Sequence, residues 1–356
     1  MSRCFIDVGV AVIVIVLLVA GTTGFILLSD NSMWLPSSQN IVGVYDARIK
    51  MLCNLSIARL RSFLESQYVP EIGLLRASVT SYPDNVTVYI ASDNLLASRA
   101  LEVVNSSYAS IVRKVLDERY GGGYDCLHEV LFGIPIDGIR TPLKIYIGRV
   151  YSRALHSYID IVYEKRCGFP LLNWYDYADL VVYKALNDLL KGRKGEAYRL
   201  FLKLMSMWDG YGFRDASSSR GVYETYKLAL AIYLFRALLA ADIYNVTRFW
   251  SVISVCCRII HELQQSCGGI ATQYIVKNGS VIAVGDPNTE TTSIVILAVY
   301  SDYPIYVGRK ALESRQSIEF VPCIYLAIPL MCVACIAIAM AMRRAKHRRN
   351  GSTPNA

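Results

Sequence analysis

The segment WDGYGFRD at residues 208–215, followed by YETYKLALAIYLFRALLA at residues 223–240, contains the pattern that organises this chain. A glycine-rich loop comes first, and the acidic residue Glu224 then opens a strongly apolar helix. Because residues 228–239, apart from Arg236, are apolar all round, this helix is expected to be enclosed by other helices. The sequence therefore predicts buried helices whose first turns follow long loops and carry acidic side chains.

The same plan occurs in two further segments. A glycine loop at residues 72–75 precedes Asp93, which opens a short apolar helix, and a glutamine and double-glycine loop at residues 264–272 precedes Glu290. Residues 177–180 are a candidate fourth opening. A repeated unit of this kind indicates helical hairpins in which each apolar helix is buried against its neighbours. We expect the long loops to gather at one end of the hairpins.

Residues 264–300 resemble the corresponding region of α/α-toroid domains, which include six-hairpin glycosidases, terpenoid cyclases and the thioester domains of macroglobulin-like proteins. The resemblance covers residues 45–300. The chain departs from these families in its number of hairpins, which is four or five. It also lacks an Asp-x-Asp-Asp motif and a Gly-Cys-Gly-Glu-Gln segment, and it shows no zinc-ligand set of the prenyltransferase type. The resemblance implies an incomplete toroid. Of the activities found in these families, glycoside hydrolysis is the one that the resemblance leaves open for this chain.

Two uncharged apolar runs lie near the ends of the chain, at residues 8–28 and 320–342. Each is long enough to cross ~30 Å of hydrocarbon as a helix. Five cations between Arg343 and Arg349 follow the second run, so residues 343–356 are expected in the cytoplasm, together with residues 1–7. A cleaved signal peptide is the alternative for the first run.

The predicted fold class is therefore mainly α. We expect an incomplete α/α-toroid of helical hairpins with a small antiparallel β insert at about residues 126–165, flanked by two transmembrane helices. Residues 30–319 form the extracytoplasmic domain in this prediction. The expected location is the cell membrane, and the lipid bilayer is the first expected partner.

Asparagine glycosylation sequons support the extracytoplasmic assignment. Five occur in the central region, at Asn54, Asn85, Asn105, Asn245 and Asn278. The same region has six cysteines, which are compatible with disulfides in an oxidising compartment or with buried thiols. These cysteines are Cys53, Cys126, Cys167, Cys256, Cys257 and Cys267.

Composition and spacing exclude several classes of function. The formal net charge is +8, but the C-terminal cluster supplies five of these charges and no basic stripe runs through the interior, so nucleic acid is not an expected partner. The four histidines share no ligand spacing, and no metal site or cofactor is predicted. No phosphate-binding loop or catalytic triad motif occurs.

Acidic and aromatic side chains at the loop ends are the candidates for chemistry. Glycoside hydrolysis needs one acid to protonate the leaving oxygen and one carboxylate to attack or to activate water, and aromatic rings stack on sugars. Asp209, Asp215 and Glu290 are the predicted catalytic residues. The predicted ligand-binding residues are Asp93, Asn94, Trp208, Tyr223 and Tyr226. Each acid also has a structural alternative, as a helix cap or a turn residue.

Three functions are compatible with these observations. The first is a domain that binds or processes carbohydrate, as a glycoside hydrolase if it is an enzyme. The second is a non-catalytic cell-envelope protein that interacts with other envelope proteins. The third is an enzyme that handles lipids or isoprenoids beside the bilayer. An acid-bearing site favours the first, a filled centre the second and a deep apolar cavity the third.

Overall fold

The computed structural model describes residues 38–302, except residues 125, 219 and 220. Of the described residues, those from 45 to 302 belong to one compact unit. The short helices that matter for the site are η2 (Ile90–Asn94), a single π-helical turn, and η4 (Leu127–Phe132), a 3₁₀-helix. The α-helices are α2 (Ser38–Cys53), α3 (Ile57–Ser66), α4 (Leu95–Val103), α5 (Tyr108–Tyr120), α6 (Ala178–Leu190), α7 (Lys194–Ser206), α8 (Thr225–Ala240), α9 (Trp250–Glu262) and α10 (Thr289–Tyr300).

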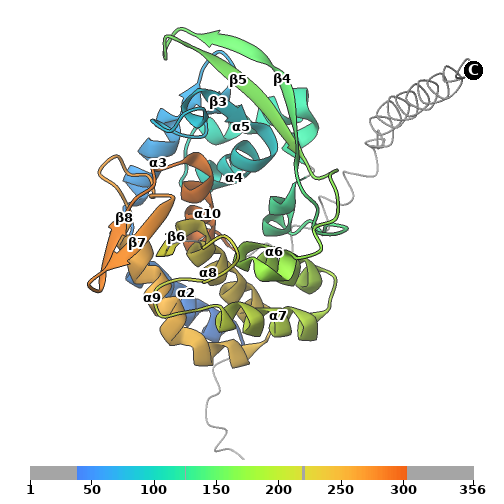
Figure 1. The fold of residues 1–356 in the computed structure, drawn as a ribbon, viewed down its shortest axis with the longest axis vertical. Coiled ribbons are helices and arrows are strands. Elements are labelled where there is room, and N and C mark those ends of the chain that lie inside the picture. Colours follow the sequence, from blue (N-terminus) through green and yellow to red (C-terminus); the bar gives the residue numbers. More distant parts are fainter. Residues whose placement is uncertain (1–37, 125, 219–220, 303–356) are drawn as a thin grey trace, which may run out of the picture. The chain divides into compact units, whose positions relative to one another are not determined.

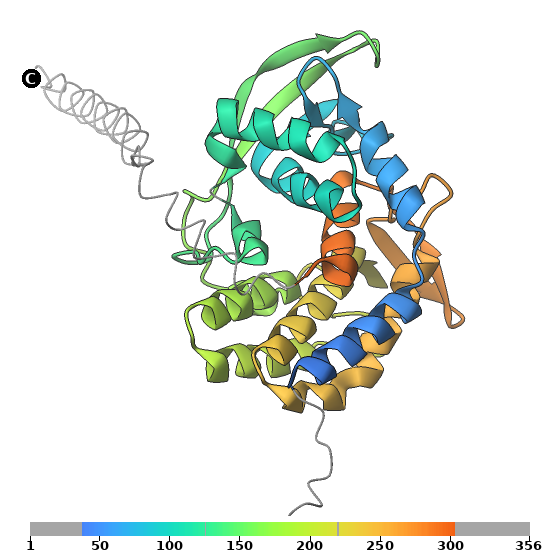
Figure 2. The ribbon, with the colours of Figure 1, turned by 180° about the vertical axis from the view of Figure 1, so that it is seen from behind.

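The two most apolar helices, α8 and α10, form the centre of the core. α10 packs between α4 and α8, and α6 packs on α8 (Figures 1 and 2). Nearly every side chain of α8 and α10 is buried, which confirms the prediction that residues 228–239 are enclosed. By contrast, α5, α7 and α9 are amphipathic, and each packs against the buried helix that precedes it.

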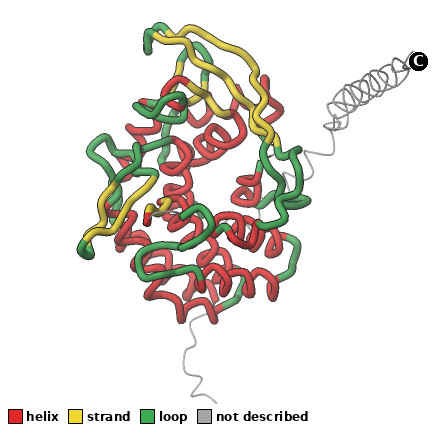
Figure 3. The backbone as a smooth tube through the Cα atoms, viewed as in Figure 1, coloured by secondary structure: helices red, strands yellow, loops and turns green. Residues whose placement is uncertain are grey.

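Three small sheets lie beside the helices (Figure 3). In the first, β4 (Leu143–Ser152) and β5 (Ser157–Lys165) are antiparallel, and β3 (Thr87–Tyr89) adds to β5 in parallel. The second is the pair β1 (Tyr68–Val69) and β2 (Leu74–Leu75). The third joins β6 (Val222–Glu224), β7 (Gln273–Lys277) and β8 (Ser280–Ala283) in antiparallel order.

The fold-class prediction, an incomplete α/α-toroid with one antiparallel β insert between two transmembrane helices, is wrong as stated. The described residues contain three sheets, and the sheet that includes the predicted insert is mixed because β3 runs parallel to β5. Residues 130–132, expected to be β-rich, belong to η4. None of the helices formed by the described residues combines the length and the apolar character that a bilayer crossing requires. The predicted spans at 8–28 and 320–342, and the flanking segments 1–7 and 343–356, lie outside the described residues.

The chain that leads from Tyr45 towards Pro70 forms two helices with a turn between them. α2 ends at Cys53, Asn54 has a φ of 40°, and α3 begins at Ile57. Asparagine tolerates this left-handed conformation better than most residues, so it allows the chain to turn between two helices. The side chain of Gln264 holds the turn, because its Oε1 accepts a hydrogen bond of 3.0 Å from the Ser56 amide.

Candidate functional site

Three carboxyl groups from distant parts of the chain converge where the buried helices begin. Asp93 comes from η2 before α4, Glu290 from the first turn of α10, and Glu164 from the end of β5. β5 and α10 both contact η2, which places the three acids around one point. Burial raises the pKa of Asp93, and repulsion from the nearby Glu290 and Glu164 raises it further. This convergence defines the acid cluster, namely Asp93, Glu164 and Glu290.

Asp93 is the most enclosed member of the acid cluster. Asp93 is only 3% exposed, and its Oδ1 accepts a hydrogen bond of 3.2 Å from the Ser92 hydroxyl. Its Oδ2 is buried without a hydrogen-bond partner among the described residues. Because an ionised carboxylate in such a place would be strongly disfavoured, Asp93 holds a proton well above its ordinary pKa.

Glu164 is poised to exchange a proton near neutral pH. Burial raises its pKa from 4.5 to about 7, although Lys144 and the hydrogen bonds from Ser92 oppose this shift. Lys144 lies directly across the β4–β5 ladder from Glu164, which explains its influence. Oε2 of Glu164 is buried and has no hydrogen-bond partner among the described residues. A carboxyl group with these properties is suited to general acid catalysis.

Glu290 is the member of the acid cluster with access to solvent. Its side chain is 33% exposed, and its Oε1 lies 3.2 Å from Nε2 of His128 on η4. The His128 ring packs edge-on against Tyr183 of α6, with ring centroids 5.4 Å apart. Asn288 caps α10 by accepting a hydrogen bond of 2.7 Å from the Thr291 amide, so Glu290 is not needed as the cap. Its carboxylate is therefore available at the cluster.

Tyrosines and further acids border the acid cluster on the α6 and α8 side. The Tyr226 hydroxyl lies 3.2 Å from both Asp179 and Glu224. Burial raises the pKa of Tyr226 and of Tyr183, and Glu290 is a charged neighbour in both cases. Both phenols therefore stay protonated and can donate hydrogen bonds beside the acids.

Lys227 neutralises part of this negative charge. The residue is only 3% exposed, and its ammonium group lies 2.6 Å from Asp215 and 2.6 Å from Glu224. These carboxylates raise the pKa of Lys227, against the effect of burial. The pairing shows that Glu224 and Asp215 serve as counter-ions of Lys227.

The predicted catalytic residue Asp209 lies in a turn. Its Oδ1 accepts hydrogen bonds from the amides of Tyr211 and Gly212, while Oδ2 accepts one of 2.5 Å from Tyr223 and pairs with Arg214. These donors hold the pKa of Asp209 below its ordinary value although burial raises it. Asp209 therefore stabilises the 209–212 turn, and these contacts do not involve the acid cluster.

Asp215, the second predicted catalytic residue, organises the loop before β6. Its carboxylate accepts a hydrogen bond of 2.8 Å from the Ala178 amide at the start of α6, and others from Ser217 and Ser218. With these donors and Lys227, its pKa is low despite burial. All of its oxygens have partners, so Asp215 fits a structural role at the border of the site.

Two of the five predicted ligand-binding residues lie in or beside the acid cluster, and the other three support the surrounding loops. Asp93 belongs to the acid cluster and Tyr226 borders it, whereas Asn94 is fully buried and bonds to the backbone of Leu75 and Tyr89. The ring of Tyr223 stacks on Tyr274, with centroids 5.3 Å apart. Trp208 packs edge-on against Phe213. Asn94, Tyr223 and Trp208 thus support the loops around the site.

Sequence reasoning missed Glu164, His128 and Asp179 as site residues. Glu164 ends a strand, a position that carries no helix-opening motif, and only its pairing with β3 and β4 brings it to η2. His128 stands alone in sequence. Asp179 could have been found from the sequence. It is the acidic residue of the fourth candidate opening, as Asp93 and Glu290 are the acidic residues of two other openings.

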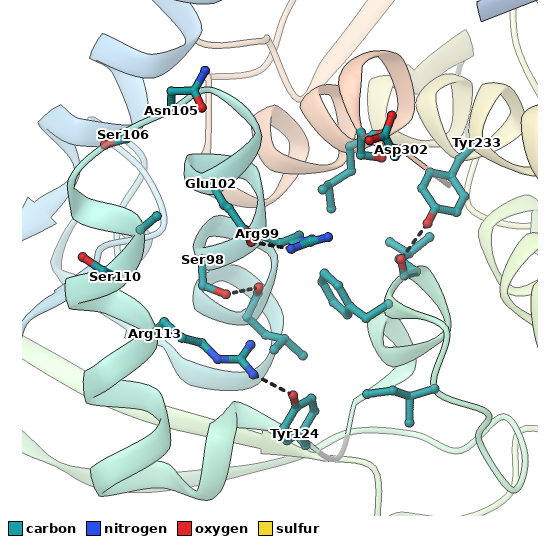
Figure 4. A pocket seen from close by; sticks show the side chains of 17 residues that line it. Ser98, Arg99, Glu102, Asn105, Ser106, Ser110, Arg113, Tyr124, Tyr233 and Asp302 are labelled. Carbon is teal, nitrogen blue, oxygen red and sulfur yellow. Dashed lines mark hydrogen bonds and ion pairs between the residues drawn. The ribbon is translucent and has the colours of Figure 1, made fainter. Parts of the chain in front are cut away.

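A cavity of about 590 Å³ lies elsewhere, along α4 and α5 where they face η4 (Figure 4). Its polar wall carries Arg99 and Arg113, and its apolar wall includes Phe132 and Leu297. Arg99 pairs with Glu102, and Arg113 pairs with Asp117 and donates to Tyr124. No member of the acid cluster lines this cavity, so it is separate from the site.

The predicted glycosylation sites are mostly accessible. Asn54, Asn105, Asn245 and Asn278 are exposed and Asn85 is half-buried, with its Oδ1 enclosed. Asn105 and Asn278, like Asn54, have positive φ values and lie at turns. Exposure at turns is compatible with glycan attachment, and the five sites stay predictions.

Within residues 38–302, apart from 125, 219 and 220, no group of three or more histidine, cysteine, aspartate or glutamate side chains is arranged to hold a metal ion.

Comparison with known proteins adds no family to this picture. The models of known protein families give no match to this chain, and a search of curated proteins gives none either.

Proposed function

We propose that the acid cluster is the active site of a carbohydrate-processing domain that hydrolyses glycosidic bonds. The observation that supports this proposal best is the meeting of two glutamates in different surroundings. Glu164 is buried with a pKa of about 7, and Glu290 is partly open to solvent beside His128. Paired carboxyl groups with unlike environments are the requirement of glycoside hydrolysis.

In the proposed reaction, Glu164 donates its proton to the glycosidic oxygen of the leaving sugar. The Glu290 carboxylate acts on the anomeric carbon, either directly or by removing a proton from the attacking water. Asp93 stays protonated and buried beside these groups, so it adds no negative charge to the site. Tyr226 and Tyr183 supply phenol donors and ring edges on the opposite side.

The predicted extracytoplasmic location fits this function, because the glycans of a cell envelope would then be within reach. Asp209 and Asp215 have no reactive role in the proposal, since their oxygens are occupied by turn amides, serines and Lys227. Glu224 likewise serves as a counter-ion.

An oligosaccharide panel assayed for release of new reducing ends tests the proposal. We expect the full-length wild-type chain to hydrolyse at least one member, and Asp209→Asn, the matched carboxylate-to-amide control, to retain that activity. Glu164→Gln and Glu290→Gln are each expected to lose it. Absence of hydrolysis by the wild type, or equal rates in all four proteins, would contradict the proposal and favour a non-catalytic envelope interaction protein.

A further inference from the structure

A pair of cysteine thiols lies on α2 and α9, and neither cysteine belongs to the acid cluster. Cys53, the last residue of α2, is hydrogen-bonded through its thiol to Cys257 of α9. Both residues are completely buried, and both carry free thiols in the structure. The two cysteines lie 204 positions apart in the chain, and the fold brings their oxidisable thiols within hydrogen-bonding range.

Three other contacts fix α2 against α9 and hold this thiol pair in register. Nδ1 of His261, one turn after Cys257, lies 3.1 Å from the Cys53 carbonyl oxygen. At the start of α9, the Trp250 ring meets the Tyr45 ring of α2 at 5.1 Å, and the Arg48 guanidinium lies 5.7 Å from the Trp250 ring. Because these contacts and that of His261 lie at the two ends of α9, the two helices cannot slide past each other without breaking them.

The neighbouring Cys256 does not share this arrangement. It is also buried and free, but it raises the pKa of Cys53 only through its charge, without the hydrogen bond that Cys257 makes, and it raises the pKa of Tyr274 on β7 as well. Successive residues of a helix point about 100° apart, so Cys256 and Cys257 cannot both face α2. The chain thus contains an internal control for any reaction of the pair.

We propose that Cys53 and Cys257 form a disulfide bond in the mature protein. The bond would covalently join α2 to α9 across 204 residues of sequence. The two thiols are already within hydrogen-bonding range, and the helices that carry them are held together by the contacts of His261, Tyr45 and Arg48.

The oxidation takes place by thiol–disulfide exchange with a disulfide donor, either a small molecule or a protein. The thiolate of one cysteine attacks the donor disulfide and releases one donor thiol, which gives a mixed disulfide. The second cysteine, after losing its proton, then attacks the protein sulfur of the mixed disulfide and releases the second donor thiol. The net reaction converts two protein thiols and one donor disulfide into one protein disulfide and two donor thiols.

The timing follows from burial. Contact with Cys257 and burial raise the pKa of the Cys53 thiol in the folded chain, so little reactive thiolate is present there. The exchange is therefore expected during folding, before α2 closes over α9. This inference does not depend on the acid cluster, and a failure of the carbohydrate proposal leaves it intact.

Peptide mapping of the full-length chain tests the disulfide. The protein is refolded in an oxidised and reduced glutathione mixture, its remaining thiols are alkylated under denaturing conditions, and it is cut with trypsin. We expect residues 51–59 linked to residues 249–258 before reduction and separate after reduction. Because the second peptide contains both Cys256 and Cys257, the variant Cys256→Ala must retain the link and Cys257→Ala must lose it.

Thermal unfolding gives a second readout. Reductant is expected to lower the Tm of the wild type and of Cys256→Ala by about 5–10 °C, and to leave the Tm of Cys53→Ala unchanged. Alkylated Cys53 in the wild-type chain after oxidative refolding would overturn the proposal. So would a link that persists in Cys257→Ala.

Discussion

Glu164→Gln is expected to reduce the rate of glycoside hydrolysis by about 10²- to 10⁴-fold while leaving the protein folded. Glutamine matches glutamate in size but cannot donate the proton that the leaving oxygen requires. The variant should also lose the alkaline limb of the pH–rate profile, because in the wild type the acid is deprotonated as the pH rises through about 7. Measurement of kcat/KM between pH 4 and pH 9, on a substrate identified with the oligosaccharide panel, provides the comparison.

The stability of the same variant separates a catalytic role from a structural one. Because the folded-state pKa of Glu164 is raised to about 7, its favourable contribution to stability is complete below about pH 4.5 and is lost as the pH rises through about 7. At pH 8 the wild type therefore holds an ionised, buried carboxylate that Glu164→Gln lacks. The variant should be at least as stable as the wild type at pH 8. A clear loss of stability there would indicate that Glu164 is structural.

Arg236→Leu is expected to lower the free energy of unfolding by about 3–5 kcal/mol. The Arg236 residue is only 3% exposed, and its guanidinium forms a two-pronged pair with Asp46, at 2.8 Å and 3.2 Å. It also donates to the carbonyl oxygens of Ala298 and Ser301, at 2.8 Å and 2.7 Å, where α10 ends. The substitution would leave these helix-end carbonyls and the Asp46 carboxylate without their donor.

The matched control for this substitution is Arg199→Leu. Arg199 pairs with Glu196 on the surface of α7, and its side chain is 66% exposed. Surface pairs of this kind contribute about 0–1 kcal/mol, so the control should unfold close to the wild type. Urea denaturation of the full-length proteins measures both effects. Equal midpoints for the two variants would show that Arg236 does not tie α2, α8 and α10 together.

The buried helices could be predicted because their signal is local. Apart from Arg236, residues 228–239 are apolar on every face of the helix, and tertiary packing then encloses them. α6 likewise begins at the candidate fourth opening, residues 177–180. Helix ends are the least predictable part, since capping contacts such as that of Asp215 with Ala178 come from distant loops.

The third sheet was missed although its turn is visible in the sequence. Asn278 and Gly279 have φ values of 52° and 78°, as a tight hairpin between β7 and β8 requires. The same Asn-Gly pair is also part of the predicted sequon at Asn278. The parallel pairing of β3 with β5 is different, because it joins residues more than 70 positions apart and has no local signal.

The candidate site was half visible in the sequence. Asp93 and Glu290 follow from the repeated helix openings, and the structure brings them together with Glu164. Asp209 was an attractive candidate because it lies beside aromatic residues, but an aspartate before a glycine is also suited to a turn, and the amides of Tyr211 and Gly212 bond to it. Which acids are free to react depends on backbone donors that only the folded chain positions.

Titration of Glu164 is the most direct test of the acid cluster. Infrared difference spectra of the carboxyl bands, wild type minus Glu164→Gln, can follow this one group in the full-length protein as the pH is changed. We expect it to lose its proton with a pKa of about 7, because burial disfavours the carboxylate. A pKa at the ordinary value near 4.5 would contradict the acid role of Glu164 and, with it, the proposed active site.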